Sequence, residues 1–185
     1  MTAESNRFFS NTRSRLLRLV SLLVMVLFIS ACGYHFAGSA ANRIAPGQSL
    51  WVAFIRNETD YVTAQTTLRR ALLEEGQALR GLHPASSVET AALRVTGNLR
   101  SIVSSQVSYS SQDQVKQFRL TVEVELELFR KGETVPVWKG TLQAFQEYPA
   151  NSNDLALQRS SEQAALVAAS QILAQKFLMA VEQVY

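Results

Sequence analysis

The segment FRLTVEVELEL, residues 118–128, alternates apolar and polar side chains without a break. Successive side chains of a β-strand point to opposite faces of the sheet, so this alternation predicts a strand with one buried face and one face in water. The sequence Lys-Gly-Glu at 131–133 predicts a tight turn, and residues 135–145 are predicted to return as the second strand of a hairpin. The apolar face of such a hairpin needs further elements to cover it.

Two more strands are predicted ahead of this hairpin. Residues 93–109 begin with the same two-residue period and form a long strand, while the Ser- and Gln-rich residues 104–114 contain the turn into the next one. Residues 50–55, LWVAFI, are apolar at every position, which predicts a strand covered on both faces, or one whose second face is covered by a partner.

Two amphipathic helices complete the pattern. Apolar residues recur at helical spacing over residues 61–79 and again over 155–184, where Asp154 or Ser152 can cap the helix. The element order is therefore β-α-β-β-β-α. It predicts an α+β fold: a two-layer sandwich with two helices packed on a four-stranded mixed β-sheet.

The amino-terminal segment has the pattern of a secretory signal peptide that ends at the only cysteine of the chain, Cys32. Four arginines precede the apolar run 19–29, and Ser30-Ala31 stands directly before Cys32. The run is shorter than the ~20 apolar residues of a membrane-spanning helix, which argues against the alternative of a transmembrane anchor. The sequence 29–32 also resembles the bacterial lipobox, in which the cysteine receives a diacylglycerol and its new amino terminus an acyl chain such as palmitate.

These features predict a domain organisation and a location. Residues 1–31 are expected to be a cleaved signal peptide, residues 32–48 a lipidated tether, and residues 49–185 a single domain. Gly33 stands where an aspartate usually retains lipoproteins in the inner membrane, so we expect an outer-membrane lipoprotein facing the periplasm. Apart from the covalent acyl chains on Cys32, no cofactor is predicted.

The charge balance argues against nucleic acid as a partner. The chain has 18 basic and 15 acidic residues, but the leader contains four of the basic and one of the acidic ones. The mature part is therefore neutral, whereas nucleic-acid binding normally needs a basic face.

No residue constellation predicts an enzyme or a metal site. The isolated histidines, His35 and His83, lack the spacing of metal ligands. Carboxylates at 123, 125 and 127 could serve acid–base chemistry, but they are better interpreted as a solvated strand face with partners such as Lys139. Basic residues near predicted strand ends could converge on one sheet edge and bind anions, or could be scattered solubilising charge: Arg100, Lys116, Arg119, Lys139 and Arg159.

Two short motifs, together with the size and the element order, resemble a known family. The start Cys-Gly-Tyr-His-Phe at 32–36 and the sequence Ser-Ser-Glu-Gln at 160–163 are similar to the start and to the last-helix entry of the LPS-assembly lipoprotein family LptE, also called RlpB. The resemblance extends over nearly the whole mature chain. It implies an α/β sandwich that is not an enzyme.

The resemblance also implies partners and site residues. Members act as plug and assembly partner of the outer-membrane β-barrel LptD and bind lipopolysaccharide on its way to the outer leaflet. Arg159 matches a basic position implicated in lipopolysaccharide binding, whereas the second such position falls near Ser111, which is not basic. Lys116 and Arg119 are nearby substitutes. Candidate contacts with the barrel wall are Ser108, Tyr109 and Trp138.

Two other classes of function compete with this interpretation. A free periplasm-facing lipoprotein could carry a small lipid or ligand in a groove between its helices and sheet. A lipid-anchored hydrolase is the third class, and no residue constellation supports it.

Overall fold

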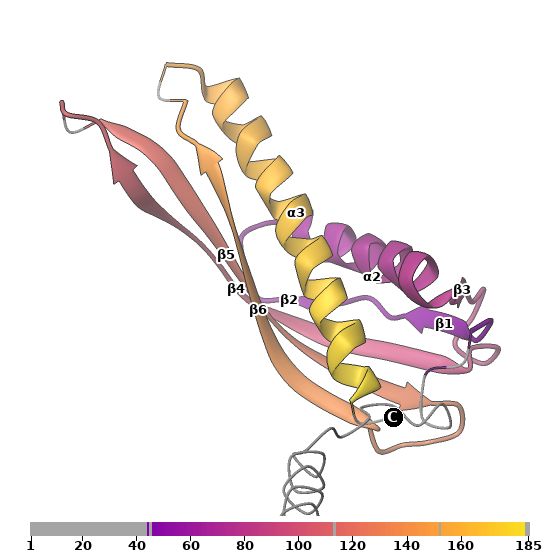
Figure 1. Ribbon diagram of the computed structural model, residues 1–185. Helices are drawn as coiled ribbons and strands as arrows, with labels where there is room; N and C mark the ends of the chain where they lie inside the picture. Colours follow the sequence, from indigo (N-terminus) through magenta and orange to yellow (C-terminus); the bar gives the residue numbers. More distant parts are fainter. Residues whose placement is uncertain (1–43, 45, 113, 152, 184–185) are drawn as a thin grey trace, which may run out of the picture. The chain divides into compact units, whose positions relative to one another are not determined.

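The computed structural model describes residues 44, 46–112, 114–151 and 153–183. The predicted signal peptide, Cys32 and most of the predicted tether lie outside the described residues. The elements, in chain order, are β1 (Ser49–Val52), β2 (Arg56–Asn57), α2 (Ala64–Arg80), β3 (His83–Pro84), β4 (Leu93–Tyr109), β5 (Val115–Arg130), β6 (Trp138–Pro149) and α3 (Leu155–Glu182) (Figure 1).

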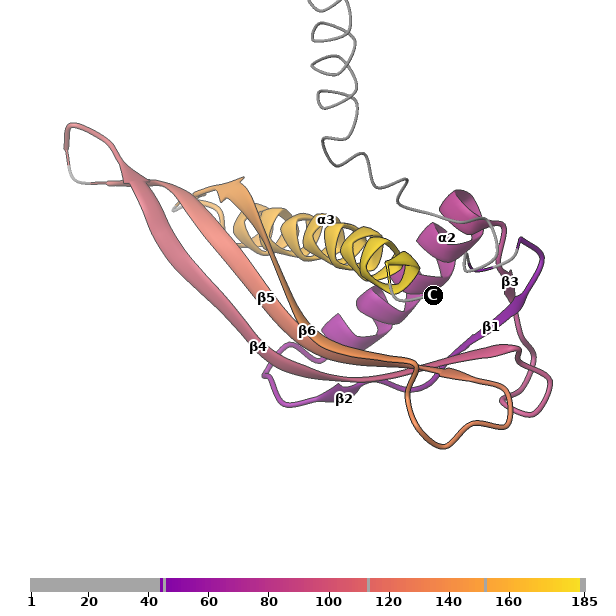
Figure 2. The same cartoon turned by 60° about the horizontal axis from the view of Figure 1, so that its bottom comes forward.

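The strands form one mixed sheet in the order β3-β1-β4-β5-β6, and β2 also pairs with β4. β1 is parallel to β3 and β4, and β2 is parallel to β4, whereas β5 is antiparallel to both β4 and β6. Both helices lie on the same face of this sheet (Figure 2). The predicted α+β fold with two helices and a mixed sheet is confirmed.

The predicted number of strands was wrong, because the sheet has six strands rather than four. Residues 50–55 do not form one strand: the chain leaves the ladder after Val52 and rejoins β4 as β2. Ile55 is buried between the two pieces, whereas Phe54 is 72% exposed, so the domain itself does not cover the second face at this position. The other additional strand, β3, is two residues long and has no sequence period to reveal it.

The core face of β5 matches the alternation of residues 118–128. Its even-numbered residues from Leu120 to Leu128 are buried, and the odd-numbered residues between them are partly exposed on the other face. Together with buried residues of the neighbouring strands β4 and β6, this face of β5 supplies most of the sheet side of the core. The helix side comes from α2 and α3, and the buried residues of α3 are Ala165, Leu166, Ala169, Ser170, Leu173, Ala174, Phe177, Leu178 and Val181.

Both helices have defined ends. The amide of Gly81, in the left-handed region with φ 62°, donates to the carbonyl of Gln77 at 2.9 Å and ends α2. The carboxylate of Asp154 accepts a hydrogen bond from the amide of Leu157 at 3.0 Å, which confirms the predicted cap of α3.

By length and composition α3 would be able to cross a membrane, the one such helix in the described part of the chain. Half of its most apolar window is buried in the domain, as in the core helix of a soluble protein.

Gly97 in β4 allows β4 and β5 to approach closely. A Cβ atom there would lie 2.5 Å from Cδ2 of Leu126 and 2.8 Å from the carbonyl oxygen of Glu125. The backbone of β5 would have to shift to admit it, and overpacking of this kind typically costs about 1–3 kcal/mol. We expect Gly97→Ala to lower the free energy of unfolding by about that amount in urea titrations. The control is Gly132→Ala in the β5–β6 turn, which meets no atom within 4 Å and reports only the cost of its positive φ; a larger loss at Gly132 would contradict the packing argument.

Candidate functional site

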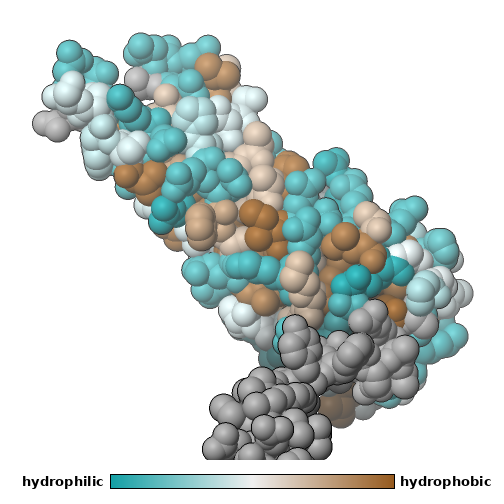
Figure 3. All heavy atoms as spheres, in the orientation of Figure 1, coloured by the Kyte–Doolittle hydropathy of each residue, from teal (hydrophilic) through white to brown (hydrophobic). Residues whose placement is uncertain are grey.

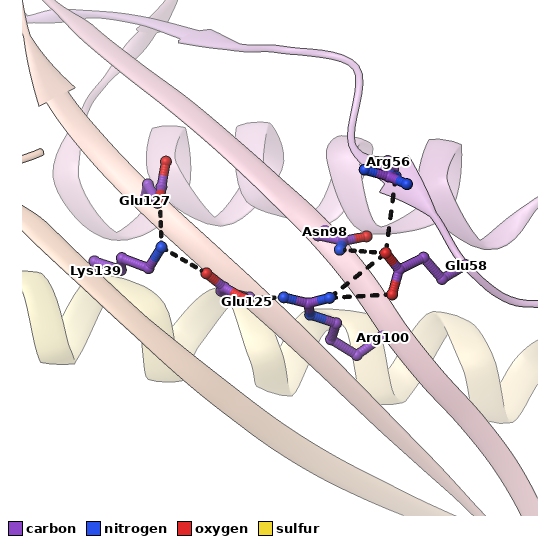
Figure 4. Close-up of polar contacts among 7 residues, drawn as sticks. All are labelled: Arg56, Glu58, Asn98, Arg100, Glu125, Glu127 and Lys139. Atoms are coloured by element: carbon purple, nitrogen blue, oxygen red, sulfur yellow. Dashed lines mark hydrogen bonds and ion pairs between the residues drawn. The ribbon is translucent and has the colours of Figure 1, made fainter. Parts of the chain in front are cut away.

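The face of the sheet opposite the helices carries a network of paired charges (Figure 4). Arg100 joins two carboxylates, 2.6 Å from Glu125 and 3.2 Å from Glu58. Lys139 continues the network on β6, with its Nζ 2.8 Å from both Glu125 and Glu127. The network also includes Asn98, which donates to Glu58, and Arg56, 3.7 Å from Glu58.

This pairing bears on whether the strand carboxylates serve acid–base chemistry or form a solvated strand face. Hydrogen bonds from Lys139 and then Arg100 lower the pKa of Glu125, and those from Asn98 and Arg100 lower the pKa of Glu58. The same contacts raise the pKa of Lys139 to about 12. Glu58 and Glu125 therefore stay ionised at neutral pH as partners of the basic residues, as expected of a solvated strand face.

The lowered pKa values predict a pH-dependent contribution to stability. The carboxylates have a pKa near 4.5 when unfolded and a lower pKa when folded, so their contribution is complete above pH 4.5 and is lost as the pH falls through the folded value. We expect Arg100→Met to be less stable than the parent chain near pH 6 and to converge with it as the pH falls below the lowered pKa values of these carboxylates, as urea titrations at several pH values would show. A gap between the two chains that stays constant with pH would contradict this assignment.

The structure separates the basic residues that the sequence suggested might converge. Arg100 and Lys139 belong to the paired network. Arg119 lies on the same outer face, bound to Glu147 at 2.6 Å and stacked 4.9 Å from the ring centre of Phe145. Register accounts for this pairing, because Glu147 of β6 stands directly opposite Arg119 of β5.

Lys116 and Arg159, in contrast, lie at one end of the molecule. Lys116 is exposed near the start of β5, and its carbonyl accepts a hydrogen bond from the amide of Ala150, at the end of β6, at 2.9 Å. Arg159 is exposed in the second turn of α3, whose first residues follow that same loop. Within the described residues, neither side chain has a hydrogen bond or an ion pair. Two uncompensated cations are therefore available to an anionic partner at this end.

A groove at this end of the molecule is lined by chain neighbours of both residues; it is formed by the β4–β5 hairpin, the β6–α3 loop and the start of α3. Its volume is about 440 Å³. Figure 3 shows hydrophobic and hydrophilic surface side by side where α3 begins. The lining residues are Gln114, Val115, Phe118, Ala150, Asn151, Leu155 and Gln158. We call this the hairpin groove.

Aromatic and polar contacts connect the hairpin groove to the core. Phe118 in its wall stacks on Tyr148 with ring centres 5.6 Å apart, and the hydroxyl of Tyr148 shares a 2.7 Å hydrogen bond with Ser104. Deeper in the domain, the hydroxyl of Tyr61 donates to Glu162 at 2.5 Å. Burial, followed by the hydrogen bond to Glu162, raises the pKa of Tyr61.

The contact of Tyr61 with Glu162 gives a structural role to the Glu-Gln pair at 162–163. Thr63 likewise donates to Gln163 at 3.4 Å, so both members of the pair join the start of α2 to α3. Sequence reasoning missed this role, because the partners are about 100 residues apart and only the pair itself was visible as a motif.

The predicted barrel contacts occupy different environments. Ser108 donates to Gln117 at 3.2 Å across the hairpin, and Tyr109, largely exposed, donates to Gln106 at 2.7 Å. Trp138 is partly buried on the helix face and packs edge-on against Phe177, with ring centres 5.3 Å apart. This packing gives Trp138 a role in the core, whereas Ser108 and Tyr109 lie near the exposed end of the hairpin.

Across residues 44, 46–112, 114–151 and 153–183, no three His, Cys, Asp or Glu side chains are grouped so that they could hold a metal ion. The only described histidine, His83, is exposed on the short strand β3.

Comparisons with known proteins identify relatives of the domain. Residues 47–181 match the model of the family described as LptE, lipopolysaccharide-assembly. That range contains every strand and nearly all of α3. No curated protein sequence matches the chain.

Solved structures share the fold at low sequence identity. A protein from Xanthomonas campestris is 15% identical with a TM-score of 0.52, over 76% of this chain and 93% of its own. A hypothetical protein from Chlamydia trachomatis is 11% identical with a TM-score of 0.52, over 75% and 96%. The rare lipoprotein B of Shewanella oneidensis is 12% identical with a TM-score of 0.46, over 70% and 92%.

Proposed function

Because this chain belongs to the lipopolysaccharide-assembly family LptE, we propose that it is an outer-membrane lipoprotein that assists the insertion of lipopolysaccharide. In this role it is held by acyl chains on Cys32 on the periplasmic side, is the plug and assembly partner of an LptD β-barrel, and performs no catalysis. The observation that carries the proposal is the family match, which extends over residues 47–181.

The unpaired cations at the hairpin groove support binding of lipopolysaccharide. Lipid A carries phosphates, and charge-assisted contacts to an arginine or a lysine are about twice as strong as neutral hydrogen bonds. Arg159 and Lys116 are exposed at the same end of the domain and have no carboxylate partner among the described residues. Arg119 is a weaker candidate, because binding a phosphate would compete with its pair to Glu147.

The sheet face opposite the helices supports enclosure by a barrel. The charges of the network on this face are paired with one another. If the wall of a partner covered the face, few of these charges would lose water without having a counter-charge. Serine and tyrosine at 108 and 109 add hydroxyl groups close to the end of the hairpin.

The filled interior counts against the alternative of a carrier with its ligand between helices and sheet. Side chains from β4, β5 and α3 that are almost fully buried fill the space between the two layers, among them Leu99, Leu126 and Leu173. A carrier of that kind would need a cavity where these residues pack.

Charge reversal at the groove tests lipopolysaccharide binding. We expect Arg159→Glu combined with Lys116→Glu to reduce retention of lipopolysaccharide by the purified protein by about tenfold or more, with an unchanged circular dichroism spectrum. The matched control is Lys131→Glu, because Lys131 is also exposed and unpaired among the described residues but follows β5 at its other end. Equal retention by the double variant and the control would remove these two residues from the site.

A further inference from the structure

The lining of the hairpin groove is largely apolar, which charge recognition alone does not require. Val115, Phe118, Ala150 and Leu155 supply apolar lining, and the polar lining consists of the neutral amides Gln114, Asn151 and Gln158. A site that bound only a phosphate would gain little from these apolar side chains. The lining thus suits the hydrocarbon part of a ligand.

The cations stand where a charged headgroup would lie. Lys116 lies between the lining residues Val115 and Phe118 on β5, and its carbonyl accepts a hydrogen bond from the amide of Ala150, another lining residue. Arg159 directly follows Gln158, another lining residue. The nearby carboxylate of Asp154 is committed to the cap of α3 through the amide of Leu157.

We propose that the hairpin groove binds one acyl chain of an anionic amphiphile, with the chain against Phe118 and Leu155 and the phosphate held by Lys116 and Arg159. This inference rests on the proposed function and adds how the ligand is recognised: by its hydrocarbon chain as well as by its charge. The volume, about 440 Å³, is near the lower end of the range of ligand sites, about 300–1,000 Å³, and therefore suits a single chain rather than all the chains of a glycolipid.

The exposed leucines at the start of α3 provide a matched pair for the test. Leu155 lines the groove and Leu157 does not, although both are largely exposed, 65% and 50%, and both belong to the first turn of the helix. Substitution of either by glutamine should leave the fold intact, because neither side chain is part of the core. A difference in ligand affinity between Leu155→Gln and Leu157→Gln therefore reports the groove and not general hydrophobicity.

The experiment measures binding of alkyl phosphates of eight, ten and twelve carbons by calorimetry, below their micellar concentrations. The protein is the whole mature chain with Cys32→Ser, so that no detergent or bilayer competes for the probe. We expect affinity to rise about fourfold per added methylene until the groove is filled. Leu155→Gln should lower the affinity about fivefold, and Leu157→Gln less than twofold. Lys116→Gln with Arg159→Gln should lower it about tenfold, and the control Lys131→Gln should not.

Several results would overturn the inference. Inorganic phosphate that binds as tightly as dodecyl phosphate would identify a simple anion site. Dodecyl maltoside that binds equally well would exclude a role for the two cations, and equal losses in Leu155→Gln and Leu157→Gln would exclude the groove. Retention of lipopolysaccharide is measured in parallel: lipopolysaccharide bound without any alkyl phosphate refutes the acyl-chain inference alone. Alkyl phosphate bound without lipopolysaccharide refutes the proposed function and leaves an acyl site.

Discussion

Replacement of Phe177 by alanine is expected to lower the free energy of unfolding by about 3–5 kcal/mol. The ring is 2% exposed at the centre of the helix–sheet interface and meets the indole of Trp138 edge-on at 5.3 Å. Its removal forfeits the burial of an aromatic side chain and leaves a cavity that the long, packed helix α3 can close only in part. Because domains of this size are stable by only about 5–15 kcal/mol, the midpoint of urea unfolding should fall markedly.

The matched control for this substitution is Phe145→Ala. Phe145 is 57% exposed on the opposite face of the sheet, where it contacts the guanidinium of Arg119. That contact is worth about 0.5–1 kcal/mol at an exposed site, so the expected loss is several times smaller. Similar losses in the two variants would mean that the helix layer does not form the core described above.

The second large effect is expected from Cys32→Ala, which should abolish stable attachment to the outer membrane. Each acyl methylene buried in a bilayer contributes about 0.8 kcal/mol, and stable anchoring takes two membrane-binding signals, which the predicted diacylglycerol and N-acyl chain supply together. Without the cysteine none of these chains can be added. Fractionation of cells and incorporation of labelled palmitate would measure the loss, and Ser39→Ala serves as the control because it changes the predicted tether but keeps Cys32. A Cys32→Ala chain that still took up palmitate would refute the assignment of Cys32.

Local periodicity predicted the long elements because it is a property of adjacent residues. The alternation at 118–128 gave the buried face of β5 residue by residue, and helical spacing gave α3 from its first residue. The two-residue strands β2 and β3 were missed because a single pair of residues carries no period. The break after Val52 was also missed, because β1 and β2 are defined by their pairing with β4, a contact between segments about 40 residues apart.

The site was also harder to predict from sequence, because its contacts join residues that are far apart in the chain. Arg119 looked like a free cation until the register of β5 and β6 placed Glu147 opposite it. The hairpin groove is assembled from residues 114–118 and 150–158, which the fold brings together although they are far apart in the chain. Sequence identified Arg159 and Lys116 as candidate lipopolysaccharide-binding residues, but their location at the same end of the domain became visible only in the structure.

Purification of the full-length, tagged lipoprotein from native outer membranes in a mild detergent tests the central claim most directly. If the chain is the plug and assembly partner of an LptD barrel, it should be recovered in a complex with one large outer-membrane β-barrel, identified by mass spectrometry. Recovery of the intact lipoprotein as a monomer, with no barrel bound, would contradict the proposed function.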